Sequence, residues 1–155
     1  KIYILFSLIV VLTNCGFKPI YKTTGDKNNM IAYSIEFQND PGYLIKNKIS
    51  SAFNSSASEN DPIIYLTTSQ ISTPLITNTN GTVSKYRVEV AIYFEIHLSD
   101  SHDNIFKDVA RGFSEYLVQT SEIQTDEKLE QAIEIATNEA IQMMSIKIQN
   151  YILQL

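Results

Sequence analysis

The feature that most constrains the fold is a long alternation of side chains between residues 85 and 98. The even positions are apolar or aromatic: Tyr86, Val88, Val90, Ile92, Phe94, Ile96 and Leu98. The odd positions are mostly polar or charged: Lys85, Arg87, Glu89, Ala91, Tyr93, Glu95 and His97. A period of two over this length predicts a β-strand with one face in a core and the other largely in water.

Three further segments predict strands. Ile31 to Gln38 alternates, Ile63 to Ile71 is rich in strand-forming residues and continues toward Ile76, and residues 105–119 carry a mixed alternation. Pro74 cannot donate to a ladder, so we expect it at an edge or a bulge. Gly112 is expected to mark a bulge at which the last strand swaps faces.

A hairpin and two helices complete the prediction. Asn80-Gly81 indicates a tight turn in which both residues have positive φ. Asp40 as N-cap and Pro41 at the first position predict a helix over 41–54. From Thr125 or Asp126 an apolar stripe of helical spacing runs to Ile152 without Gly or Pro. The order β-α-β-β-β-α predicts an α+β fold with one mixed four-stranded sheet and two helices on one face, forming a single domain over 30–155.

The N-terminal segment is typical of an exported lipoprotein. Lys1 precedes an apolar run from Ile2 to Leu12, which is shorter than the roughly 20 residues that a membrane-spanning helix needs. Leu12-Thr13-Asn14-Cys15 resembles a lipobox, although Asn14 departs from the preferred small residue. We expect residues 1–14 to be a lipoprotein signal peptide, Cys15 to carry diacylglycerol and an N-acyl chain, and residues 15–29 to form a lipidated tether to the membrane.

Composition narrows the class of partner. The net charge is −5 and no basic run occurs, which argues against nucleic acid. Cys15 is the only cysteine, so lipidation would leave no thiol for a disulfide. The content of charged residues, 19%, is that of a folded globular domain.

Few residues suggest catalysis. His97, Asp100, His102 and Asp103 lie close together in the sequence and could ligate a metal or serve a hydrolase. Ordinary turn chemistry explains the same residues more simply. Phosphate-loop and nucleophile-elbow motifs do not occur. We therefore expect a protein that is not an enzyme, has no metal site and needs no cofactor besides the lipid on Cys15.

Four cations form a candidate binding site. If the strands at 85–98 and 105–119 pair, Lys85, Arg87, Lys107 and Arg111 share the wet face of the sheet. Arginine suits forked contact with phosphate. The alternative is an ordinary mixed, solvated face without a ligand.

Several segments together resemble the LptE family of lipopolysaccharide-assembly lipoproteins, in its alphaproteobacterial form. The resemblance lies in the order and spacing of Cys15–Tyr21 (CGFKPIY), Tyr86–Val90 (YRVEV), Ala110–Tyr116 (ARGFSEY) and the long helix from Asp126. It implies two helices against a four-stranded sheet. It also implies a lipid-anchored protein on the periplasmic side of the outer membrane, which plugs the LptD β-barrel and helps it to assemble.

The resemblance implies a ligand as well. Such a protein would contact lipopolysaccharide through basic residues, for which Lys85, Arg87, Lys107 and Arg111 are the candidates. An auxiliary lipoprotein of an ABC-type lipid transporter would need a similar anchor and domain. A hydrolase built on the histidine and aspartate cluster is a third alternative.

Overall fold

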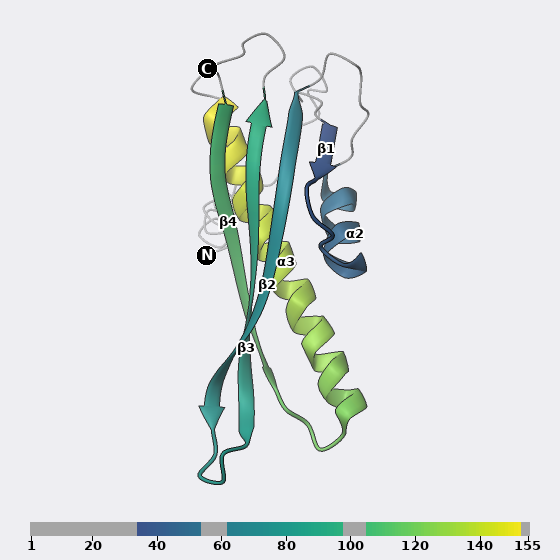
Figure 1. Cartoon of the computed structure of the whole chain (residues 1–155), viewed down its shortest axis with the longest axis vertical. Helices are drawn as coiled ribbons and strands as arrows, with labels where there is room; N and C mark the ends of the chain where they lie inside the picture. The colour runs from purple at the N-terminus through teal and green to yellow at the C-terminus, as the bar shows by residue number, and fades with distance from the viewer. Residues whose placement is uncertain (1–33, 54–61, 98–104, 153–155) are drawn as a thin grey trace, which may run out of the picture. The chain divides into compact units, whose positions relative to one another are not determined.

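The computed structural model describes residues 34–53, 62–97 and 105–152. Its elements are β1 (Ser34–Phe37), α2 (Tyr43–Ala52), β2 (Ile63–Thr77), β3 (Val83–His97), β4 (Ile105–Leu117) and α3 (Glu122–Ile152). The four strands form one sheet in the order β1-β2-β3-β4, with β1 parallel to β2 and the other neighbours antiparallel (Figure 1). The predicted α+β fold, its element order and its mixed sheet are confirmed.

The core lies between the sheet and the two helices. The even positions of β3 from Val88 to Ile96 are buried, as the alternation predicts. α3 contributes small side chains over β4 and β3, including Ala132, Ala136 and Ala140, while α2 adds Ile45 and Ile49. The opposite face of the sheet therefore presents the odd positions of β3.

The expected bulge at Gly112 is wrong. β3 and β4 stay in register along their whole pairing, including Val90 opposite Gly112. A Cβ atom on this glycine would collide with the main chain of α3. Gly112 therefore serves close packing of strand and helix, and β4 keeps Phe106, Ala110 and Tyr116 on the core side throughout.

The start of α2 also differs from the prediction. Gly42 with φ of 76° is the N-cap, and the helix begins at Tyr43 rather than at Pro41. The Asp40 carboxylate accepts a hydrogen bond of 3.1 Å from the Gly42 N–H, so it stabilises the preceding turn instead of the helix end. A glycine is required here because φ is positive.

The β2–β3 hairpin lies where predicted, but its turn is of another kind. Gly81 has φ of 85°, whereas Asn80 is not in the positive region. The Gly81 N–H donates to the Asn78 carbonyl at 3.0 Å, and the Asn78 N–H to the Thr82 carbonyl at 2.8 Å. Only one residue of the pair thus needs positive φ. The expected bulge near Pro74 is confirmed by a register shift between Pro74 and Ile76.

α3 begins one turn earlier than its apolar stripe indicates, at Glu122. The Thr125 hydroxyl oxygen accepts the Gln119 N–H at 2.9 Å, so this side chain fixes the preceding loop rather than capping the helix. Of the two neighbouring methionines, Met144 is fully buried and Met143 is 43% exposed. The last helix therefore lies across the sheet with Met144 in the core.

Candidate binding face

The four candidate cations share the outer face of the sheet, away from the helices, but they are spread along it: Lys107 is opposite Glu95, ten positions along β3 from Lys85. Lys85 and Arg87 are at odd positions of β3, and Lys107 and Arg111 are at odd positions of β4, so one face carries all four. The register places Arg87 opposite Glu115. The sequence thus predicted the location of these residues correctly, while a binding role for them stays a prediction.

Each cation is paired with a carboxylate. Lys85 and Arg87 share Glu115, with 3.1 Å between Arg87 Nη2 and Glu115 Oε1. Arg111 Nε lies 3.0 Å from Glu89 Oε1, and Lys107 Nζ lies 2.7 Å from Glu95 Oε2. We call these residues the ion-pair ladder: Lys85, Arg87, Glu89, Glu95, Lys107, Arg111 and Glu115. The structure therefore brings Lys85 and Arg87 to one carboxylate and gives Lys107 and Arg111 separate ones.

The pairing favours the ionised form of two of the ladder carboxylates, Glu95 and Glu115. Hydrogen bonds from Lys107 and then from His97 lower the pKa of Glu95 below its usual value. Hydrogen bonds from Lys85 and Arg87 lower the pKa of Glu115 in the same way. Because opposite charges and donated hydrogen bonds favour the charged form of a carboxylate, Glu95 and Glu115 are ionised at neutral pH.

The ladder is suited to exchange of partners. Its four cations face three carboxylates, so one positive charge is in excess. The Arg87 and Lys107 side chains are 49% and 65% exposed. Exposed ion pairs contribute about 0–1 kcal/mol each, so a multivalent anion can displace a carboxylate at small cost.

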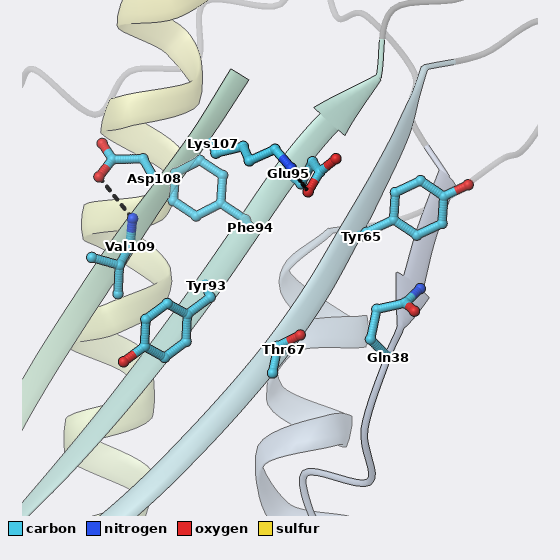
Figure 2. A pocket seen from close by; sticks show the side chains of 9 residues that line it. All are labelled: Gln38, Tyr65, Thr67, Tyr93, Phe94, Glu95, Lys107, Asp108 and Val109. Carbon is cyan, nitrogen blue, oxygen red and sulfur yellow. Dashed lines mark hydrogen bonds and ion pairs between the residues drawn. The ribbon is translucent and has the colours of Figure 1, made fainter. Parts of the chain in front are cut away.

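A shallow hollow of about 380 Å³ lies at one end of this face. Figure 2 shows Tyr65 of β2 and Tyr93 of β3 at its sides, with Lys107 reaching toward Glu95 beside them. Tyr65 packs edge-on against the His97 ring, with ring centroids 4.9 Å apart. This end of the face combines aromatic surface with charge.

A second hollow of about 420 Å³ lies at the other end of β3 and β4. Lys85 of the ladder lines it together with Lys128 of α3, and Leu117 and Ile135 add apolar surface. Leu117 and Ile135 are 55% and 57% exposed. Lys128 was not predicted from the sequence. Periodicity shows which face of its own helix a residue lies on, but it does not show that this face meets the end of β4 at Leu117.

The described residues offer no support for the histidine and aspartate cluster. Asp100, His102 and Asp103 lie outside them. The His97 ring contacts the Glu95 carboxylate, with 2.6 Å between His97 Nε2 and Glu95 Oε1. Within the ranges that the structure covers, no group of three or more His, Cys, Asp or Glu residues could hold a metal ion.

The signal peptide over 1–14, Cys15 and the tether over 15–29 also lie outside the described residues. In the part of the chain that is described, no helix has the length and hydropathy needed to cross a membrane.

Fold and face together define a two-layer α+β domain with a charged ladder on a sheet face that no described helix or strand covers. Solved structures share this fold. Rare lipoprotein B from Shewanella oneidensis matches at a TM-score of 0.52 and 18% identity, covering 77% of this chain and 98% of that one. A candidate lipoprotein from Caulobacter crescentus matches at 0.61 and 12% identity, covering 79% and 90%.

A third structure, a minor lipoprotein from Acinetobacter baumannii, matches at a TM-score of 0.58 and 12% identity, covering 78% of this chain and 92% of that one. At identities this low, the three structural matches establish a common fold alone. No protein-family model and no curated protein sequence matches the chain.

Proposed function

We propose that this protein is an outer-membrane lipoprotein of the LptE type, anchored on the periplasmic side. It plugs the LptD β-barrel, assists the assembly of that barrel and supports the insertion of lipopolysaccharide into the outer leaflet. The role requires no catalysis and no cofactor besides the acyl chains on Cys15.

The shared fold is the observation that carries this proposal. Three solved proteins described as lipoproteins match over 90–98% of their length. The likeness extends over the sheet and helices, while the lipobox-like segment ending at Cys15 supplies the anchor independently. Several acyl chains give firm attachment, because each buried methylene adds about 0.8 kcal/mol of membrane affinity.

The outer face of the sheet supports lipopolysaccharide as the ligand. Lipid phosphates can replace Glu115 beside Lys85 and Arg87, since these ion pairs are exposed. The adjoining hollow adds Lys128 as a further cation and Leu117 as apolar surface for a chain. Lys107 and Arg111 add two further exposed cations along β4, each paired with a carboxylate that a phosphate can replace.

A detergent pull-down from the native envelope tests the proposal. Tagged full-length protein should retain LptD as its main partner. Retention of an inner-membrane ATPase instead would favour the auxiliary lipoprotein of an ABC-type transporter. Normal envelope assembly after replacing His97 and His102 with alanine would remove the support for a hydrolase.

A further inference from the structure

The free edge of β2 is covered over only part of its length. β1 pairs with β2 from Ser34 opposite Ile63 to Phe37 opposite Leu66. The Asn39 carboxamide then acts as one more ladder position, since its Nδ2 donates to the Thr68 carbonyl at 2.7 Å and its Oδ1 accepts the Thr68 N–H at 2.9 Å. No other described residue pairs with this edge after Thr68.

The next main-chain groups on this edge belong to Gln70, Ser72 and Pro74. Alternate residues of a strand turn their N–H and C=O to opposite sides. The carbonyls of Pro62 and Leu66 accept hydrogen bonds on the β1 side. The even-numbered residues of β2 therefore turn their main-chain groups toward this edge. Pro74 has no N–H, so the row of main-chain donors along this edge ends there. Because Pro74 faces the edge, its missing N–H removes no hydrogen bond to β3.

This edge lacks the charges that usually protect a free strand. Residues 62–84 contain no charged side chain. Ile71 and Ile76 are 54% and 50% exposed, and Figure 1 shows the β2–β3 hairpin extending past the first turn of α3. Exposed, uncharged edges pair readily with other strands, and soluble proteins normally guard them with lysine or a covering element.

The opposite edge of the sheet shows the contrast. On β4, the Phe113 N–H donates to the Glu139 carboxylate at 2.7 Å, and the Val109 carbonyl accepts Lys147 Nζ at 3.0 Å. Both side chains come from α3. The protein therefore closes one edge with charged side chains, whereas no described residue pairs with the donors and acceptors of the other edge after Thr68.

We propose that the β2 edge at Gln70 to Pro74 receives an extended, uncharged segment of the barrel partner as an added strand. The inference rests on the proposed function and names the contact surface. Main-chain hydrogen bonds would supply affinity, and Ile71 would contribute apolar contact on the outer face.

A second copy of this chain fits the edge less well. Antiparallel self-pairing about Ser72 places Gln70 opposite Pro74, which has no N–H to donate. Pairing about Ile71 is limited by Asn39, which already occupies Thr68.

Binding of full-length protein to purified LptD in detergent tests the inference. Ser72→Pro removes a donor that only an added strand would use, so the dissociation constant should rise about tenfold with the melting temperature unchanged. Thr79→Pro is the matched control, because Thr79 lies in the turn and proline suits the second position of such turns. Amide hydrogen exchange at Gln70 and Ser72 should slow in the complex.

The possible failures are distinguishable. Equal affinity for Ser72→Pro and wild type, with unchanged exchange at Gln70, overturns the edge inference and leaves the proposed function standing. Absence of binding by the wild type overturns both. A wild-type dimer in analytical ultracentrifugation that Ser72→Pro converts to a monomer identifies a second copy as the occupant and also overturns the inference.

Discussion

Gly112 of β4 lies directly against the main chain of α3 at Ala136. A Cβ atom on Gly112 would stand 1.9 Å from the Ala136 carbonyl oxygen and 2.6 Å from the Ala140 nitrogen. Both neighbours are backbone atoms, which cannot rotate away as a side chain can. The position of α3 on the sheet therefore depends on the absence of a single methyl group.

Replacement of Gly112 by alanine should lower the free energy of unfolding by about 3 kcal/mol, because overpacking displaces helix from strand. Urea denaturation measures the loss. Gly81→Ala is the comparison, since Gly81 has open space around it and should cost only the roughly 1–2 kcal/mol of a positive φ. A smaller loss for Gly112→Ala than for Gly81→Ala would contradict the packing argument.

The two adjacent methionines give a matched pair for the core. Met144→Ala should cost about 2–5 kcal/mol, because a fully buried side chain leaves a cavity. Met143→Ala should stay within about 0.5 kcal/mol, because its side chain is partly exposed and does not belong to the core cluster. Thermal unfolding of both variants checks this, and similar losses for both would mean that α3 is rotated from the position described.

Asp108 should make stability depend on pH. Partial burial acts to raise its pKa, but hydrogen bonds from Lys147 and from the Val109 N–H outweigh this, and the pKa is lowered. Because the pKa is lower in the folded state, ionised Asp108 stabilises the fold at pH values above the ordinary pKa of 3.8. This stabilisation is lost as the pH falls through the folded-state pKa.

Wild type should therefore be more stable than Asp108→Asn at pH 7, and the difference should disappear in strong acid. Melting temperatures measured from pH 7 to pH 2 test this. Asp40→Asn, on an exposed turn, is the control. A difference that persists unchanged at pH 2 would show that shape rather than charge is responsible.

The ion-pair ladder predicts opposite effects of two kinds of substitution on lipopolysaccharide binding. Charge reversal at Arg87 and Arg111 should weaken binding by about tenfold or more, because each adds repulsion to lost attraction. Glu115→Gln should strengthen binding, since it releases Lys85 and Arg87 from their carboxylate.

Isothermal titration with lipopolysaccharide measures both effects. Lys48→Glu is the matched control, because Lys48 pairs with Glu134 of α3, away from the outer face. If the dissociation constant changes as much for Lys48→Glu as for Arg87→Glu, only general charge is involved, and the ladder is not the site.

Cys15→Ser should abolish acyl labelling in cells fed radioactive palmitate, since the thiol is the acceptor of the diacylglycerol. The domain should fold normally, as measured by circular dichroism, because the described core lies within residues 34–152. A serine variant that still takes up label would contradict the lipoprotein interpretation.

The local pattern of the sequence predicted much of the fold. Alternation in β3 identified the buried positions from Val88 to Ile96, and the same period placed the four candidate cations on one face. The edge position of Pro74 also followed from the sequence, because its missing N–H is a property of the residue itself. Each of these predictions depends only on near neighbours in the chain.

Only the tertiary structure decided which distant segments of the chain are in contact. Gly112 looks the same in sequence whether it forms a bulge or admits a helix, and only the approach of Ala136 distinguishes the two. Likewise, Asn39 extends the sheet at Thr68, and Lys147 closes the β4 edge, without any periodic signal. Periodicity records which way a side chain points, whereas the packing of helices on the sheet determines what it meets there.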